Sequence, residues 1–214
     1  FSHMGRLHHF MKSERSLEDV AWTENTEGRL ENEIARKNRE LRRIRTFVRK
    51  RSHKSEFENY LLQIFDEFFH PASSLEEALR KEDFSEYYRN VIMTGEFCHG
   101  DFQYHNVIFA KAGIAVTNFE KYQFDGVVRD FANFLRKVLE KNGWDGEITK
   151  ICLDAYMSEY EMTKAEKNLL FYRMSYPEKF RKTVNCYMNS NKAMLSDKML
   201  EKVKTIVAGK RFSA

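Results

Sequence analysis

The sequence predicts a mostly helical α+β fold that contains one β-hairpin. Proline and glycine are scarce, at 2 and 9 of 214 residues, and this composition favours long helices over a many-turned all-β fold. Apolar residues recur at helical spacing along most of the chain. One pair of short β-prone runs around a glycine-containing turn interrupts that pattern.

Composition also excludes several classes of protein. Aromatic residues make up 14% of the chain, which is too much apolar mass for a disordered protein. No apolar run approaches about 18 residues, and no basic segment precedes an apolar core at the start, so we expect neither a membrane span nor a signal peptide. The net charge of +4 is too small to demand a polyanionic partner. The cysteines include no C-x-x-C pair, which argues against a disulfide framework and a zinc site.

Residues 27–52 are expected to form one basic helix with a single apolar stripe. Between Arg36 and Lys54 there are ten basic residues and one acid, Glu40. The basic side of this helix is either an ordinary solvated face or an anion-binding surface, because clustered lysines and arginines raise the local positive potential.

The next helix has a wide apolar face over residues 57–69 that must be buried. Pro71 is expected to end it, because the residue before a proline is pushed out of the α region. Ser73 or Ser74 would then cap a third helix. That third helix is expected to extend to about residue 92.

The hairpin is expected where residues 107–110 and 114–117 flank a turn at 111–113. Helical spacing returns from Val127 to Leu139, and Gly143 can close that helix. The remaining helices are expected at 146–160, 163–174, 177–190 and 196–208.

One stretch, residues 98–109, carries the candidate chemistry. Within it, His99-Gly100-Asp101 is followed five residues after the aspartate by Asn106, which opens the hairpin. Asn118-Phe119-Glu120 lies on the return strand, and Asp130 comes ten residues later on the next helix. This order resembles the catalytic core of the kinase-like phosphotransferases, the superfamily of the aminoglycoside phosphotransferases and choline kinase, whose catalytic loop has the form H-G-D-x-x-x-x-N.

The resemblance implies a role for each of these side chains. Asp101 would be the catalytic base that orients the substrate hydroxyl, and His99 would hold the loop by hydrogen bonds. Asn106 would bind the cofactor through a magnesium ion. Members of the superfamily place a metal-binding aspartate where this chain has Asn118, which lacks the charge. Glu120 would point to the same side of a strand as Asn118 and could supply the missing carboxylate, so the candidate metal ligands are Asn106, Asn118 and Glu120.

The resemblance covers only the C-terminal lobe of the kinase-like fold. In that fold a mostly β N-lobe supplies a glycine-rich loop and a lysine for the nucleotide phosphates. Here the residues before the loop are predicted to be helical, with no G-x-G-x-x-G motif, and residues 4–10 look like the first C-lobe helix. We therefore expect one C-lobe domain with the N-lobe missing, divided as residues 1–94 (helical, with the basic helix 27–52), 95–122 (loop and hairpin) and 123–214 (helical).

Further segments make the chain similar to the spore coat protein S (CotS) family of endospore-forming bacteria. Besides the basic helix and the loop, these segments are residues 55–58, 117–121, 128–131, 134–137, 176–180 and 189–192. Membership implies a kinase-like fold and a place in the spore coat, after synthesis in the cytoplasm of the mother cell.

Two functions are open on these grounds. The first is a spore coat protein with a structural or interaction role, catalytically degenerate and without a cofactor, whose partners are other coat proteins or the missing N-lobe. The second is a phosphotransferase that uses ATP and magnesium to phosphorylate a small hydroxylated or sugar-like acceptor. Asn118 and the missing N-lobe favour the first, whereas the intact Asp101 and Asn106 favour the second. We expect neither a membrane nor a nucleic acid as a partner, since no stacking aromatics interleave with the basic residues of the 36–54 segment.

Overall fold

The computed structural model describes residues 1–13, 29–111, 113–189 and 192–212 of the chain. These residues belong to two compact units. Unit 1 comprises residues 1–29 and 83–174, and unit 2 comprises residues 30–82 and 175–214. The expectation of one domain across residues 1–214 stays a prediction.

Unit 1 carries the candidate loop and the hairpin. Its helices are α1 (Ser2–Ser13), α4 (Ser85–Thr94), α5 (Val128–Lys141), α6 (Gly146–Met157) and nearly all of α7 (Lys164–Ser175). The core is aromatic: the Phe131 ring of α5 stacks on Tyr156 of α6 with 3.8 Å between centroids, and both side chains are fully buried. His8 of α1 contacts the same tyrosine, with 2.7 Å between its Nδ1 and the hydroxyl oxygen. The contacts of Tyr156 therefore join α1, α5 and α6 into the support on which the loop lies.

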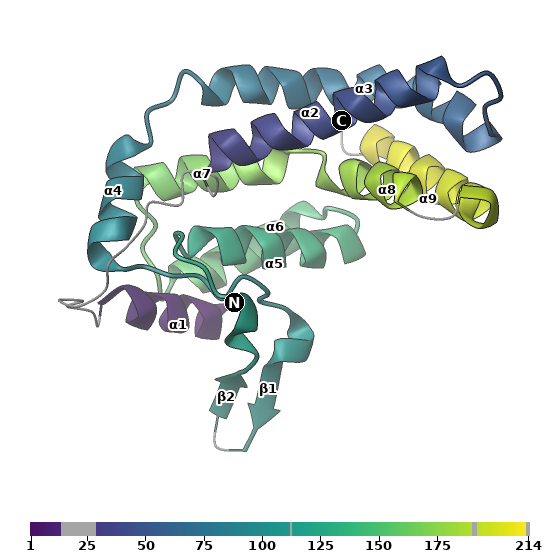
Figure 1. The fold of residues 1–214 in the computed structure, drawn as a ribbon. Coiled ribbons are helices and arrows are strands. Elements are labelled where there is room, and N and C mark those ends of the chain that lie inside the picture. The colour runs from purple at the N-terminus through teal and green to yellow at the C-terminus, as the bar shows by residue number, and fades with distance from the viewer. Residues whose placement is uncertain (14–28, 112, 190–191, 213–214) are drawn as a thin grey trace. The chain divides into compact units, whose positions relative to one another are not determined.

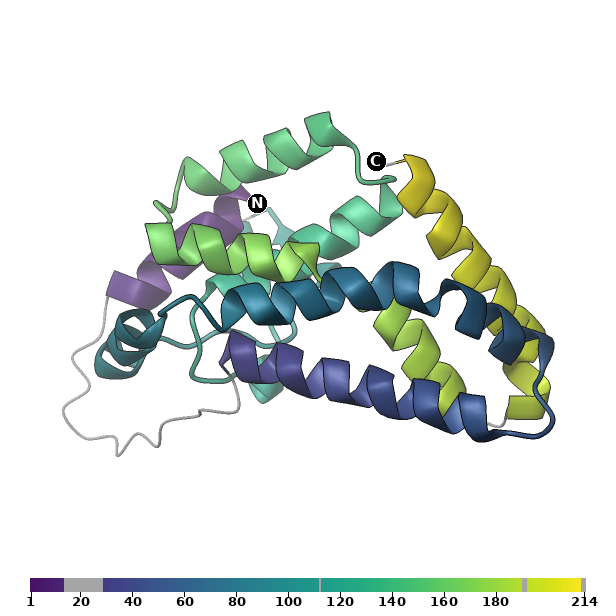
Figure 2. The same ribbon diagram turned by 90° about the horizontal axis from the view of Figure 1, so that it is seen from above.

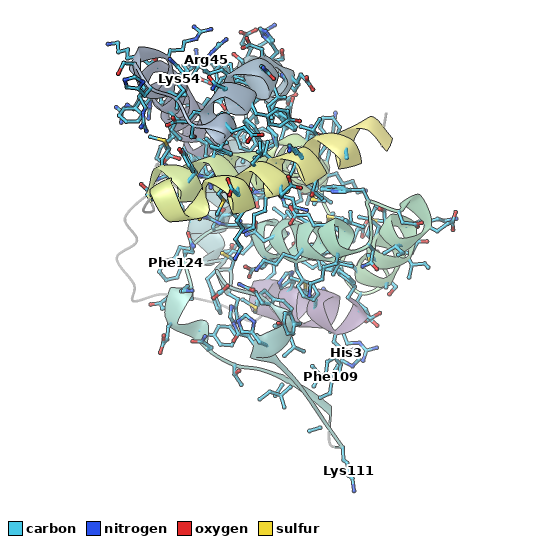
Figure 3. All side chains as sticks on the ribbon, turned by 90° about the vertical axis from the view of Figure 1, so that its right-hand side faces the viewer. His3, Arg45, Lys54, Phe109, Lys111 and Phe124 are labelled. Atoms are coloured by element: carbon cyan, nitrogen blue, oxygen red, sulfur yellow. The ribbon has the colours of Figure 1, made fainter. Side chains whose placement is uncertain are left out.

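The hairpin lies where the sequence predicts it. Strands β1 (Val107–Ala110) and β2 (Gly113–Val116) pair antiparallel, with Val107 opposite Val116 and Ala110 opposite Gly113. The two strands extend away from the helices of unit 1 (Figure 1), and the side chains labelled near their far end point outward (Figure 3). Of these, Phe109 is 78% exposed. The turn residue 112 lies outside the described residues.

Unit 2 is a helical assembly around an aromatic core. Its helices are α2 (Leu30–Lys50), α3 (Glu56–Leu79), α8 (Glu178–Met188) and α9 (Lys192–Phe212). Helices α2 and α3 run side by side (Figure 2), and their apolar faces meet α8 and α9. At the centre, Phe68 stacks on Phe180 with 4.3 Å between ring centroids. The wide apolar face predicted for residues 57–69 is buried here, as its spacing requires.

The prediction that Pro71 ends a helix is wrong. Helix α3 continues through Pro71 to Leu79, so neither Ser73 nor Ser74 caps a new helix. An interior proline removes one backbone hydrogen bond and strains the preceding turn. Burial of the apolar face of α3 in unit 2 offsets that loss, and Asn38 of α2 donates a further hydrogen bond from Nδ2 to the Ala72 carbonyl oxygen (2.9 Å), immediately after the proline. The local preference is therefore overridden by packing between α2 and α3.

For most of the other helices, the predicted first and last residues lie within a few residues of the observed ones. The third predicted helix is divided, because α3 ends at Leu79 and α4 begins separately at Ser85. Residues 27–28 of the predicted basic helix and residues 190–191 of the segment 189–192 lie outside the described part of the chain. No described helix is long and apolar enough to cross a membrane.

Candidate functional site

The backbone of the candidate loop is clamped from beneath by Asp130. This residue lies in the first turn of α5 and is almost completely buried. Its Oδ2 accepts a hydrogen bond from the His99 amide (2.5 Å), and its Oδ1 accepts one from the Gly100 amide (3.0 Å). Burial raises the pKa of Asp130 to about 6. Both carboxylate oxygens of Asp130 thus position the loop, and neither hydrogen bond involves Asp101.

Gly100 allows the loop to lie directly against the segment that follows the hairpin. Its φ of +77° is in the left-handed region. A Cβ at this position would lie 1.9 Å from the carbonyl oxygen of Lys121. The close approach of the two backbones therefore requires glycine.

His99 joins the loop to the base of the hairpin. Its ring is almost completely buried, with Nε2 2.9 Å from the Thr117 carbonyl oxygen and Nδ1 3.2 Å from the Asp101 amide nitrogen. A carbonyl oxygen can only accept and an amide N–H can only donate, so these partners assign the proton to Nε2. Both ring nitrogens of His99 therefore make hydrogen bonds that hold the loop in place. A catalytic role for His99 stays a prediction.

Both oxygens of the Asp101 carboxylate have partners. The Lys121 ammonium donates to Oδ2 (2.8 Å), and the Gln103 side-chain amide donates to Oδ1. The hydrogen bond from Lys121, and then that from Gln103, lowers the pKa of Asp101 below its ordinary value. A carboxylate with a lowered pKa and two donors already in place is a weaker proton acceptor for a substrate hydroxyl.

Asn106 lies below the loop and is almost completely buried. Its side-chain Nδ2 donates a hydrogen bond to the Asp101 backbone carbonyl oxygen (2.9 Å), and its backbone carbonyl oxygen accepts one from the Thr117 amide (3.0 Å). The structure therefore brings Asp101, Asn106 and His99 together around Thr117. Binding of a nucleotide or a metal by Asn106 stays a prediction.

The prediction that Asn118 and Glu120 lie on a strand is wrong. Strand β2 ends at Val116, and Asn118 has a φ of +67°, in the left-handed region. Asparagine tolerates that conformation better than most residues, and it reverses the chain into a 3-10 turn closed by a hydrogen bond from the Tyr122 amide to the Phe119 carbonyl oxygen. Asn118 and Glu120 are both exposed, and the alternation of a strand does not relate them. Whether either binds a metal stays a prediction.

The oxygen donors of this site do not fit the magnesium ions that the kinase-like fold implies. Magnesium prefers carboxylate oxygens as ligands. In the described part of the chain, no group of three or more histidine, cysteine, aspartate or glutamate side chains is placed so that it could hold a metal ion. The Asp101 carboxylate is bound to an ammonium group, and the amides of Asn106 and Asn118 are neutral. The Glu120 carboxylate is one of the charges that raise the pKa of Lys121, after the larger contribution of Asp101. We therefore derive no chemical step that depends on a metal.

Asp130, Gln103 and Lys121 also shape the site. The spacing pattern of the sequence includes these three residues but does not indicate what their side chains bind. The sequence shows a lysine three residues after Asn118. It does not show that a 3-10 turn aims that lysine at Asp101, because the turn depends on the left-handed backbone of Asn118.

Glu96 supports the start of α5, which carries Asp130. Its Oε1 accepts a hydrogen bond from the Val127 amide (2.9 Å), and the side chain is 3% exposed. Burial raises the pKa of Glu96 from 4.5 to about 7. The folded state therefore binds this proton more tightly than the unfolded state. The stability contributed by the group is complete below about pH 4.5 and is lost as the pH rises through about 7.

Glu96→Gln is expected to stabilise the protein at about pH 8 by on the order of 2 kcal/mol, because the amide keeps an oxygen for Val127 and carries no buried charge. The gain should vanish at about pH 3, well below the ordinary value of 4.5, where the wild-type carboxyl is protonated in both states. Urea unfolding at the two pH values measures both quantities. The exposed Glu77→Gln is the control, and an equal gain for Glu96→Gln at both pH values would contradict the assignment.

The chain is similar to known proteins in sequence and in fold. Residues 35–211 match the family model described as "Spore coat putative kinase YutH". The chain belongs to this family. The prediction that the chain belongs to a spore coat family related to kinases is thereby confirmed, whereas assignment to the CotS family stays a proposal.

A solved structure shows the same fold as this YutH-family chain. It is the crystal structure of an aminoglycoside phosphotransferase from Alicyclobacillus acidocaldarius subsp. acidocaldarius DSM 446, with a TM-score of 0.77 and 18% sequence identity. The match covers 98% of this chain and 63% of that one, so the YutH-family chain spans less than two thirds of its length. The predicted class, mostly helical and kinase-like with one small two-stranded sheet, is confirmed.

Proposed function

We propose that this YutH-family protein is a pseudokinase of the spore coat, similar to the CotS type, which acts through interactions and does not transfer phosphate. The observation that carries the proposal is the state of the Asp101 carboxylate. Lys121 and Gln103 bind its two oxygens, and the chain has Asn118 where related phosphotransferases have a metal-binding aspartate. The residue that would accept a proton is thus neutralised by the chain itself.

Electrostatics supports a large catalytic deficit. Phosphoryl transfer depends on positioning and on charges that stabilise the transferring group. Losing one such preorganised contact typically slows a reaction about 100- to 1000-fold. Replacement of a carboxylate by Asn118 is one loss, and the ammonium of Lys121 on Asp101 is a second obstacle.

An interaction role implies that the partners are other coat proteins, or a lobe of the N-terminal type that covers the hairpin. The exposed apolar side chains Ile108 and Phe109 of β1 are consistent with a covered surface, since they are 50% and 78% exposed. In this function the protein needs no cofactor. Its place of action would be the spore coat, after synthesis in the mother cell.

A phosphotransferase acting with ATP and magnesium on a small hydroxylated or sugar-like acceptor is the second candidate. One observation favours it: the loop is fully assembled, with Asn106 donating a hydrogen bond to the Asp101 carbonyl oxygen and Asp130 clamping the backbone. The Lys121 side chain is 67% exposed, so a bound nucleotide could displace it from Asp101 without breaking the core.

We expect that the protein consumes no ATP above background in the presence of magnesium, with sugar, amino-alcohol or protein acceptors. Asn118→Asp alone should not restore turnover, because Lys121 still neutralises Asp101. Lys121→Ala, which frees the carboxylate, should not restore it either, because the charge at position 118 is still absent. The measurement is acceptor-dependent ATP consumption by the wild type and each variant.

Asp101→Ala is the decisive control for that assay. If the wild type shows acceptor-stimulated turnover and Asp101→Ala abolishes it while the melting temperature is unchanged, the pseudokinase proposal is wrong and the phosphotransferase replaces it.

A further inference from the structure

Helix α2 carries a row of cations that the fold does not use. Arg36, Arg39, Arg43 and Lys50, called here the basic stripe, are all exposed. Their spacing of i, i+3, i+7 and i+14 places them within about 60° of one another around the helix axis. At 1.5 Å per residue the stripe is about 21 Å long.

The stripe differs from most of the other basic side chains of this segment. None of its four side chains has an ion pair or hydrogen bond with another described residue. The basic residues beside it have acidic partners within unit 2: Lys37 with Glu33 and Glu178, Arg42 with Glu76, Arg45 with Asp66, and Arg51 with Glu58. Side chains tipped with nitrogen surround the labelled Arg45 and Lys54 in Figure 3. Apart from the exposed Arg49, the positive charge of α2 is thus neutralised beside the stripe and left uncompensated along it.

The side chains of the stripe make no ion pair or hydrogen bond that holds the described residues together. Arg36, Arg39 and Arg43 are neighbours at spacings of three and four residues, and like charges at these spacings destabilise a helix. The apolar face of α2, which includes Leu41 and Val48, supplies the packing instead. A repulsive row that the core does not require indicates use by a partner.

We propose that the basic stripe docks an acidic helical segment of another protein, one whose carboxylates recur at the same helical spacing. Three of the four cations are arginines, whose planar guanidinium groups bind carboxylates through two parallel hydrogen bonds. Phe47 lies within the row, between Arg43 and Lys50, and is 44% exposed. It offers the apolar contact that an amphipathic helix makes beside its charges.

Other polyanions fit this surface less well. A site for single-stranded nucleic acid combines cations with several aromatic side chains on which bases stack, whereas Phe47 is the one aromatic residue within the row. A helix that binds an anionic membrane inserts its apolar face into the lipid, but the apolar face of α2 is buried in unit 2. The chemistry of the stripe therefore favours a protein helix.

This inference extends the proposed interaction role to a second place on the chain, and it does not depend on the state of Asp101. Peptide binding can be measured without ATP, and ATP consumption can be measured without the peptide. Failure of one proposal is therefore distinguishable from failure of the other.

The test uses a fluorescent alanine-based helical peptide with glutamates at i, i+3, i+7 and i+14, and a second peptide with the same glutamates distributed around the helix. At low ionic strength, where exposed charges are least screened, the full chain should bind the aligned peptide more tightly than the scattered one. The quadruple variant Arg36→Gln, Arg39→Gln, Arg43→Gln and Lys50→Gln should weaken binding by about tenfold or more.

The matched control removes four charges elsewhere, at exposed lysines without an ion pair to any described residue: Lys81→Gln, Lys150→Gln, Lys164→Gln and Lys167→Gln. It should change binding by less than about twofold, since only the distant field of the protein is altered. A charge exchange sharpens the result. Arg43→Glu should weaken binding, and the peptide with lysine in place of the facing glutamate should restore it.

Several results would overturn the proposal. Equal weakening by the stripe variant and the control would show a response to net charge alone, and equal affinity for the two peptides would show that spacing is not recognised. If duplex DNA or vesicles containing anionic lipid bind more tightly than the aligned peptide and lose that binding in the stripe variant, the surface recognises a nucleic acid or a membrane instead.

Discussion

Gly100→Ala is expected to destabilise unit 1 by about 3–4 kcal/mol, and it has one of the largest effects we expect for any substitution in the site. Two costs combine. The left-handed backbone at φ +77° disfavours a side chain, and the new Cβ would lie 1.9 Å from the Lys121 carbonyl oxygen. Both atoms are fixed by the backbone, so no change of rotamer relieves the clash, and the loop must move away from the turn that carries Lys121. Thermal and urea unfolding measure the loss.

Gly143→Ala is the matched control for this experiment. Gly143 also has a positive φ, +65°, but nothing lies within 4 Å of the position that its Cβ would occupy. It should cost only the conformational part, about 1 kcal/mol. An equal loss of stability in Gly100→Ala and Gly143→Ala would show that the close contact between Gly100 and the Lys121 carbonyl oxygen adds nothing to the requirement for glycine.

Asp130→Ala is the second substitution with a large expected effect, about 2–4 kcal/mol. It leaves the buried amide of His99 and the partly buried amide of Gly100 without their acceptor, and each unsatisfied buried donor costs roughly 1–3 kcal/mol. Hydrogen exchange at these two amides should accelerate by more than the loss of global stability alone explains. Mass spectrometry or NMR measures that exchange.

Two further variants separate the clamp from general effects of charge. Asp130→Asn keeps one acceptor oxygen, so hydrogen exchange should fall between the wild type and Asp130→Ala. Stability should follow the same order at pH values below the raised pKa of about 6, where the wild-type side chain carries no buried charge. Asp154→Ala removes an exposed acid from α6 and should leave both quantities unchanged. Exchange at His99 and Gly100 that stays slow in Asp130→Ala would contradict the assigned clamp.

The sequence predicted those parts of the fold that depend on local spacing. The apolar periodicity of α3 and α5 required a buried face in each, and both faces are buried. The order of His99, Asp101 and Asn106 before the hairpin is a spacing pattern as well. In the structure these residues are joined within one loop by hydrogen bonds from the Asp101 amide to His99 Nδ1 and from Asn106 Nδ2 to the Asp101 carbonyl oxygen.

The sequence failed where contacts between distant residues decide the structure. Pro71 breaks an isolated helix, but in α3 a hydrogen bond from Asn38, more than thirty residues earlier, supports the next turn. The sequence predicts that Asn118 lies at the end of a strand, whereas in the structure its backbone is left-handed and ends the extended segment. The partner of Asp101 follows from that turn, so the ion pair with Lys121 could not be predicted before the turn itself.

The register of the two hairpin strands depends on contacts at the base of the hairpin, beside the candidate site. Residues 108–110 of β1 are all exposed, so no buried face selects the pairing of the two strands. Their alignment is instead held at the base, by the hydrogen bonds of Thr117 with Asn106 and with His99. A slip by one residue would break both bonds and move Asn118 by about 3.4 Å. The contacts at Thr117 therefore set the register of the hairpin. A substitution at the far end of the hairpin should leave Asp101 in place, whereas a substitution at Thr117 should alter both the strand register and the position of Asp101.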